Sequence, residues 1–421
     1  MRSNYLWYQF FRYGVVCPAL QMFHSEITVG GADKIPQDKP VIFVGNHQNA
    51  LMDALHVVTN TQLFVHFLTR AEPFQMPVLK HFFRSLNMLP VYRIRDGFST
   101  IRKNAATFGQ CYQRLAQGDA VLVFAEANHD LKRRVRPLSK GFTRIAFGAE
   151  QNYNWSLDLQ VQPVGLSYGR HRKSQTPVHV EFGDCIPVAD FKQQYEKDKR
   201  EAAHQLKLAA AQELKQVTMH VPSLDNYPIY HLLLDELESD RSKVLVPDIV
   251  NDRVSVTADY VNEERVEESK KLIKKADSNG VKLADFVNST SFSVGDLLLS
   301  PLYIFALINN AIPYGFVHWV TSDYIEDHVF DATAKFLLGL FMLPVYYLVI
   351  SVLLGFAGVN FSWIGGYFVA SVLTAPFFVR AKNLLSTNSA QKLKQKKPVA
   401  YESLKTGLDE FEELREKILK G

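Results

Sequence analysis

Apolar runs alternate with helical repeats over the first half of the chain. Segments rich in apolar residues at 27–29, 41–44, 63–68, 120–124, 157–166 and 178–182 predict strands, and the uninterrupted apolar runs at 41–44 and 120–124 predict strands buried on both faces. Between them, residues 78–86 and 97–117 have apolar side chains at helical spacing. Strands that alternate with helices predict an α/β layer structure, here a mixed sheet flanked by helices at 25–190.

The second half of the chain follows a different pattern. Residues 191–294 are polar or strongly charged with helical periodicity, which predicts a charged helical spacer or lid. No residue is charged from Phe336 to Val379, a stretch that would measure about 66 Å as a helix, roughly twice a hydrocarbon core. Gly358, Gly365 and Gly366 interrupt it, so we expect a hairpin of two membrane-spanning helices at 336–379.

Three further segments complete the expected organisation. An uncharged stretch at 297–322 contains Pro301 and Pro313 and is a kinked span or a re-entrant segment, within a membrane region at 295–380. The aromatic-rich residues 1–24 form an interfacial membrane helix or an ordinary packing helix. Residues 381–421 are expected to form a basic cytosolic tail with a solvent-exposed helix at 403–419, because its lysine cluster favours the inside of the membrane.

Composition and net charge exclude only a few classes of function. The chain has 421 residues, 47% of them hydrophobic, and a net charge of +4. This mild charge gives no reason to expect a nucleic-acid partner. Cys17, Cys111 and Cys185 are too few and too scattered for a disulfide framework or a zinc site, so we expect a reducing compartment and no metal.

The strongest chemical candidate is the segment Gly45–Asp53, at a strand-to-helix junction. His47 precedes Asp53 by six residues, a spacing that places them about 120° apart on a continuous helix. The two side chains therefore meet only if the chain between them is partly non-helical. If they meet, Asp53 fixes the tautomer of His47, whose second nitrogen then accepts a proton from a substrate hydroxyl. The alternative is a surface histidine followed by a helix-capping acid.

Two other polar sites follow apolar strands. Arg93 comes after 88–92, and Glu126 comes after 120–124, followed by a basic run that includes Lys132 and Lys140. Ligands of α/β proteins gather at the carboxyl ends of strands, and arginine can bind a phosphate with two hydrogen bonds. Taken singly, these residues are also explained as a surface charge, a turn cap and a contact with anionic lipid.

Taken together, the ordered blocks resemble the glycerolipid acyltransferase superfamily, which includes the glycerol-3-phosphate and lysophosphatidate acyltransferases. The resemblance covers about 25–190. Its four blocks are Asn46-His47 through Asp53, Leu89-Pro90-Val91-Tyr92-Arg93, Phe124-Ala125-Glu126-Ala127 and Val161-Gln162-Pro163-Val164.

Two departures from the family pattern refine this resemblance. Five residues separate His47 from Asp53, where the family usually has four. The longer spacing resembles the branch of glycerol-3-phosphate and dihydroxyacetone-phosphate acyltransferases, whose members also carry C-terminal membrane spans. The third block lacks its usual proline and glycine, and His129 stands where many members have arginine.

The resemblance implies a membrane-bound enzyme that moves an acyl group from acyl-CoA or an acyl carrier protein to the hydroxyl of glycerol 3-phosphate, without a further cofactor. His47 would be the base and Asp53 its orienting acid. The acceptor and its phosphate would be bound by residues of the other blocks and of the basic run, namely Asn46, Arg93, Glu126, His129, Arg133, Arg134 and Lys140.

Two alternatives stay open. A sister enzyme would acylate 1-acylglycerol 3-phosphate or an aminolipid, and a degenerate member would bind membrane lipid without catalysis. Because acyl thioesters are made in the cytosol, we expect the catalytic domain to face the cytosol. With the basic tail on the same side, 336–379 supplies both spans and 297–322 does not cross.

Overall fold

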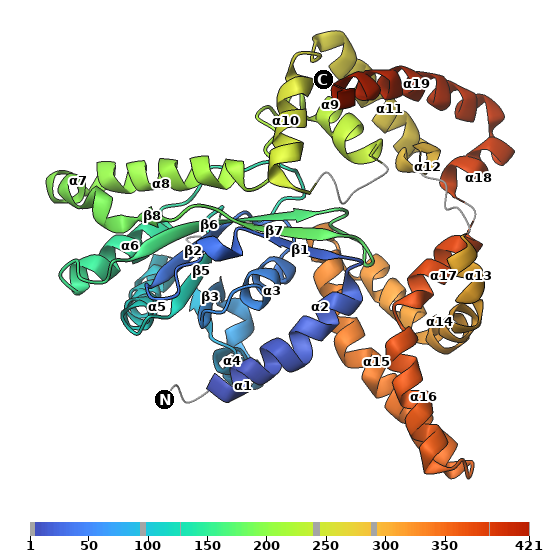
Figure 1. Ribbon diagram of the computed structural model, residues 1–421, viewed down its shortest axis with the longest axis horizontal. Coiled ribbons are helices and arrows are strands. Elements are labelled where there is room, and N and C mark those ends of the chain that lie inside the picture. Colours follow the sequence, from blue (N-terminus) through green and yellow to red (C-terminus); the bar gives the residue numbers. More distant parts are fainter. Residues whose placement is uncertain are drawn as a thin grey trace.

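The computed structural model describes residues 5–92, 98–126, 128–238, 245–287, 293–386 and 388–420. Figure 1 shows a twisted sheet with helices on both faces, a helical domain beside it, and a group of long helices that projects away from both. The expected mixed α/β sheet is confirmed, together with a mostly helical C-terminal region.

The sheet has eight strands in the order β1-β7-β6-β2-β5-β3-β4, with β8 paired to β6. The pairings between the described strands are parallel except β6 with β7 and β6 with β8. The strands are β1 (Ile27–Gly30), β2 (Val41–Gly45), β3 (Val65–Arg70), β4 (Met88–Val91), β5 (Ala120–Phe124), β6 (Gln160–Tyr168), β7 (Val178–Phe182) and β8 (Ile186–Pro187). The parallel strands β2, β3, β4, β5 and β6 therefore end at one edge.

The central strand β2 has every residue buried, because helices cover both faces of the sheet. Ile42 and Val44 face a core built with α5, α6 and α8, whereas Val41 and Phe43 face the core under α3. The helices of this domain are α1 (Tyr5–Gln9), α2 (Cys17–Phe23), α3 (Leu51–Thr59), α4 (Pro77–Ser85), α5 (Phe98–Ala116), α6 (Gly141–Asn152), α7 (Lys192–Lys197) and α8 (Lys199–Gln216).

Both ends of the α/β domain differ from the sequence-based expectation. The charged helix α8 buries Leu206, Ala210 and Leu214 in the sheet core, so the domain extends beyond residue 190. At the other end, the N-terminal helices pack Tyr8 and Leu20 against the domain and expose Leu6 and Phe10 on their outer side. The first 24 residues thus combine a packing face with an apolar surface.

The remaining helices outside the projecting group share one hydrophobic core. They are α9 (Tyr227–His231), α10 (Pro247–Ala258), α11 (Glu263–Ser278), α12 (Ala284–Val287), α18 (Ser389–Lys396) and α19 (Pro398–Lys420). The helix expected to be exposed at 403–419 instead buries Leu404, Leu408 and Phe411 in this core. Its heptad-like spacing is that of a packed amphipathic helix, and the C-terminal segment is part of a domain.

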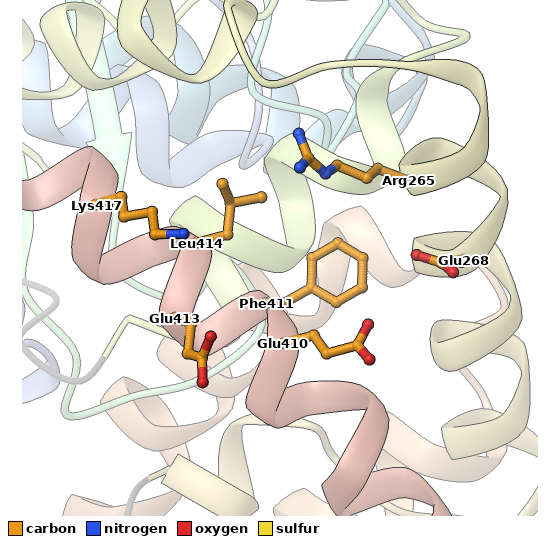
Figure 2. Close-up of a pocket in the computed structure, with 7 residues that line it drawn as sticks. All are labelled: Arg265, Glu268, Glu410, Phe411, Glu413, Leu414 and Lys417. Carbon is orange, nitrogen blue, oxygen red and sulfur yellow. The ribbon is translucent and has the colours of Figure 1, made fainter.

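The contact between α11 and α19 is close because Gly407 has no side chain; a Cβ there would lie 2.6 Å from Leu272. Buried Glu238 adds ion pairs to Arg253 at 3.0 Å and Arg415 at 2.9 Å. A small cavity of about 160 Å³ remains at the surface between the two helices, where charged side chains surround Phe411 and Leu414 (Figure 2).

The projecting group is inserted into the chain of the helical domain. It comprises α13 (Val294–Leu298), α14 (Ser300–Asp323), α15 (Asp331–Phe356), α16 (Phe361–Thr374) and α17 (Phe377–Leu385). The chain leaves the helical domain after α12 and re-enters it at α18, where Ser389 donates two hydrogen bonds to Asp285. Close to this point, Arg380 pairs with Asp296 at 2.7 Å.

Among the described residues, one helix, His328–Phe356, is long and apolar enough to cross a membrane. A second candidate exists only if α16 and the helices after it count as one span, since the chain bends there by 64°. The segment 297–322 lies mostly within α14, a helix that is not among these candidates. Where a hairpin of two spans was expected at 336–379, α15 alone is long and apolar enough to cross a membrane by itself, and α16 has only 14 residues.

The burial of α19 predicts that its core residues stabilise the helical domain. Leu404→Ala should lower the free energy of unfolding by about 2–5 kcal/mol, since it leaves a cavity at a fully buried position. Lys405→Ala, on the exposed side of the same turn, is the matched control. Chemical denaturation of both proteins in detergent measures the difference; equal stabilities would mean that α19 does not belong to this core.

Candidate active site

The site begins where β2 ends, at the edge shared by the carboxyl ends of the parallel strands. Gly45 pairs with Phe124 of β5, and a Cβ on Gly45 would approach the Phe124 ring to 2.9 Å. The absence of that side chain lets the Phe124 ring stack on the His47 imidazole, with 4.4 Å between centroids and 11° between planes. One face of His47 is thereby fixed.

His47 and Asp53 meet as the sequence predicts. The Nδ1 atom of His47 lies 2.8 Å from Oδ2 of Asp53. The helix α3 begins only at Leu51, and Ala50 before it has φ of 47° and ψ of −124°. This conformation costs a non-glycine residue about 1–3 kcal/mol, and it turns the loop so that both side chains point to one place.

The surroundings of Asp53 determine the tautomer of His47. The carboxylate is fully buried and accepts hydrogen bonds from the backbone N–H groups of Gln48 and Asn49, at 2.9 and 2.8 Å, and from the Tyr168 hydroxyl at 2.7 Å. Because Asp53 is an acceptor here, Nδ1 of His47 carries the proton. Nε2 is then unprotonated in a side chain that is 17% exposed, and it is available as a base.

Glu126 holds this loop from the other side. Its carboxylate accepts from the His47 N–H at 3.1 Å and from the backbone and guanidinium of Arg136. Burial raises the pKa of Glu126, and the bonds to Arg136 oppose that shift. The sequence places Glu126 in the acceptor site, but both of its oxygens have protein partners. Through these bonds it holds the loop that carries His47.

Three other residues expected to contact the substrate lie among protein groups. The amide of Asn46 is fully buried and exchanges two hydrogen bonds with the backbone of Leu166, which fastens β2 to β6. Arg133 is buried and binds the Tyr168 carbonyl at 2.7 Å and Asp235 at 3.2 Å. Arg134 lies near His220. The contacts of Asn46 and Arg133 thus join segments of the protein that are distant in sequence.

His129 does reach the site. Its ring lies edge-on to His47 with 5.5 Å between centroids, and edge-on to Phe330 at 4.9 Å. Burial lowers the pKa of His129, the charges of His47 and Arg70 lower it further, and Asp327 opposes the shift through a 3.3 Å contact. Arg70 is thus a cation close to His129, and the sequence did not single it out.

Arg70 ends β3 at the same edge of the sheet. Its side chain is 37% exposed, lies 3.9 Å from Glu72, and its Nε has no hydrogen-bond partner within the described part of the chain. In the sheet register Arg70 is paired with Val91, two residues before Arg93. Arg93 itself lies outside the described residues. Lys140 is exposed and lines a separate cavity between α5, α6 and α8.

The first turn of α15 covers part of this site. Asp331 binds Arg172 at 2.7 Å, and the Thr333 hydroxyl approaches the Asn49 carbonyl at 3.5 Å. Ala332 and Phe336 form a small core with Leu20 and Met52. The helix that is long and apolar enough to cross a membrane is therefore joined to the loop that carries His47. No metal-binding group of three or more His, Cys, Asp or Glu was found among the described residues.

Two buried histidines lie beneath Tyr168. Nε2 of His24 is 3.0 Å from Nε2 of His56, and the His56 ring packs against Tyr168. His24 donates through Nδ1 to the Thr176 carbonyl, so His56 donates to His24. Burial lowers the pKa of both imidazoles, of His24 to about 4, and raises that of Tyr168, which keeps all three neutral.

Comparison with known proteins connects this geometry to one family. Residues 26–167 match the family model described as acyltransferase. A 1-acyl-sn-glycerol-3-phosphate acyltransferase of Chlamydomonas reinhardtii is 25% identical over 130 residues, which are 31% of this chain and 37% of that protein. Glycerol-3-phosphate O-acyltransferase 2 of Saccharomyces cerevisiae is 22% identical over 375 residues, 79% of this chain and 49% of that protein. The chain thus spans half or less of these curated relatives.

Among solved structures, the 1-acyl-sn-glycerophosphate acyltransferase PlsC of Thermotoga maritima is similar at 20% identity and a TM-score of 0.37. The match covers 51% of this chain and 84% of that chain.

The four bonds to Asp53 predict a measurable role for Tyr168. Tyr168→Phe removes the donor to Oδ1 of a buried carboxylate and should lower the free energy of unfolding by about 1–3 kcal/mol. Tyr153→Phe is the control, because no hydrogen bond of its hydroxyl is found among the described residues. Equal denaturation midpoints for the two variants would show that the Tyr168 hydroxyl contributes nothing to holding Asp53.

Proposed function

We propose a function that starts from one point: residues 26–167 are an acyltransferase domain of the glycerolipid acyltransferase superfamily. The protein transfers a fatty acyl group from a thioester to the hydroxyl of glycerol 3-phosphate at a membrane. The observation that carries the proposal is the His47–Asp53 pair at the edge of the sheet, in which Asp53 lies 2.8 Å from Nδ1 of His47. The S. cerevisiae relative, aligned over 79% of this chain, supports glycerol 3-phosphate over its acylated product as acceptor.

The chemistry follows from the tautomer. Nε2 of His47 takes the proton of the acceptor hydroxyl while the oxygen attacks the thioester carbonyl carbon. Asp53 stabilises the imidazolium that forms. The tetrahedral intermediate collapses, the C–S bond breaks, and the leaving thiolate takes the proton from His47. The ester and the free thiol are the products, and the protein returns to its starting state.

The acceptor phosphate needs a cation near His47. Arg70 meets this need, because it ends β3 at the edge of the sheet where His47 lies, and its Nε has no hydrogen-bond partner within the described part of the chain. A guanidinium binds a phosphate through two hydrogen bonds and neutralises part of its charge. We assign the phosphate contact to Arg70, together with Arg93 after the neighbouring strand.

The connections of the projecting helices support a membrane arrangement with both domains on one side. The chain enters α14 and leaves α17 near the same Asp296–Arg380 pair, so the number of complete crossings between them is even. α15 begins beside the active site, so it and the bent α16 segment form the two crossings, and α14 lies along the surface. The lysines at 392–397 support a cytosolic location for this side, where acyl thioesters are made.

Replacement of His47 tests the proposed chemistry. His47→Ala should lower kcat by about 10²–10⁴-fold, because the proton of the attacking hydroxyl loses its acceptor. Asp53→Asn should fall in a similar range, since the wrong tautomer of His47 is then favoured. The assay uses purified full-length protein with a labelled thioester and glycerol 3-phosphate. Activity of His47→Ala within a few fold of the wild type would refute the mechanism.

Replacement of Arg70 tests the phosphate contact separately. Arg70→Ala should raise KM for the acceptor roughly 10- to 100-fold and change KM for the donor little, because a charged hydrogen bond contributes about 1.5–3 kcal/mol. Arg70→Lys should restore only part of this loss, since an ammonium cannot form the paired contact. Arg84→Ala, exposed on α4, is the control. Equal increases for donor and acceptor would assign Arg70 a structural role.

A further inference from the structure

A second, larger cavity lies outside the site described above. It has a volume of about 640 Å³ between α5, α6 and α8, a size typical of small-molecule sites. Phe108, Tyr112 and Phe147 contribute aromatic surface to its wall. Tyr195 stacks on Phe147 with 4.6 Å between centroids, and Lys199 lies 5.2 Å above the Tyr195 ring. The wall therefore presents flat aromatic groups beside a cation.

The charged residues that line this cavity all have the same sign. They are Lys140, Arg144, Lys199 and Arg200, and the described residues of the lining include no carboxylate. All four are exposed. None of them lies within 4.0 Å of a carboxylate in the part of the chain that the structure describes. Four cations around one hollow repel one another, so the arrangement favours a ligand with several negative charges.

The cavity extends from the edge of the active site along α6. At the end near the active site, Asn104 exchanges two hydrogen bonds with Tyr92, which follows β4. Lys140 lies at the same end, because the N–H of Ser139 before it donates to the carbonyl of Ala125, the neighbour of Glu126. The far end is marked by Gln151, eleven residues further along α6, or about 16 Å of helix. A ligand here can therefore reach the catalytic edge only through an extended arm.

We propose that this cavity binds the phosphorylated adenosine end of a coenzyme A thioester. An adenine ring stacks on aromatic side chains, and its phosphates pair with lysine and arginine. The pantetheine arm supplies the length that carries the thioester from α6 to His47. This inference rests on the proposed function, and it identifies the donor as a nucleotide thioester bound apart from the acceptor.

Charge reversal at the far end of the cavity tests the proposal. The double variant K199E/R200E should raise KM for palmitoyl-CoA roughly tenfold or more and leave kcat nearly unchanged. KM for S-palmitoyl-pantetheine, which lacks the nucleotide, should stay at the wild-type value. Adenosine 3′,5′-bisphosphate should bind the wild-type protein in equilibrium dialysis and bind the variant much more weakly. K271E/K274E, exposed on α11, is the control with the same change of charge.

Several results would overturn the proposal. They are an unchanged KM for palmitoyl-CoA in K199E/R200E, an equal rise for both donors, or no binding of the bisphosphate by the wild type. Use of acyl carrier protein thioesters alone, without inhibition by the bisphosphate, would assign the cations to a protein donor and likewise refute it. A wild type that binds the bisphosphate through Lys199 and Arg200 but transfers no acyl group would uphold this site and refute the proposed function.

Discussion

The buried carboxylate of Asp53 is the interaction on which the catalytic edge depends. A carboxylate removed from water is costly unless hydrogen bonds replace its hydration. Asp53 has four such partners, two from the backbone of its own loop and one each from His47 and Tyr168. These bonds offset the strained conformation of Ala50 and fix the position of His47. The loop conformation and the protonation state of the base thus have one cause.

The same loop connects catalysis to the proposed membrane arrangement. The first turn of α15 packs on Met52 and contacts Asn49, and Asp327 before it binds His129. A helix suited to cross a membrane is therefore attached within a few residues of the base. The helical domain, closed by α18 and α19 after the projecting helices, fixes the other end of the insertion. An acyl chain leaving a bilayer would meet the site directly.

Much of the sheet can be predicted from the sequence, because parallel strands buried on both faces are continuous apolar runs. The strands at 120–124 and 178–182 have the expected bounds. The spacing of His47 and Asp53 alone would place them about 120° apart on a continuous helix, and they meet because α3 begins only at Leu51. Partners brought from distant segments carry no local signal. In the sequence, Tyr168 is only a residue at the end of a strand, and nothing near it indicates its bond to Asp53. The burial of Arg133 likewise depends on Asp235, about a hundred residues later.

Amphipathic helices explain the other differences. α8 and α19 have enough charge to suggest solvent exposure, yet a narrow apolar stripe on each is sufficient to join a core. Sequence periodicity shows that such a stripe exists but does not show which surface it covers. The role of Glu126 is similar, since a carboxylate after a strand looks identical whether its partner is a ligand or Arg136.

The central claim is that this edge transfers an acyl group to a phosphorylated alcohol. The most direct test incubates the purified full-length protein with a radiolabelled long-chain acyl-CoA and a panel of acceptors, and identifies the lipid products. The panel contains glycerol 3-phosphate, dihydroxyacetone phosphate, 1-acylglycerol 3-phosphate, an aminolipid and unphosphorylated glycerol. The account predicts 1-acylglycerol 3-phosphate as the main product and none from glycerol. Equal acylation of glycerol, or no labelled product from any acceptor, would contradict it.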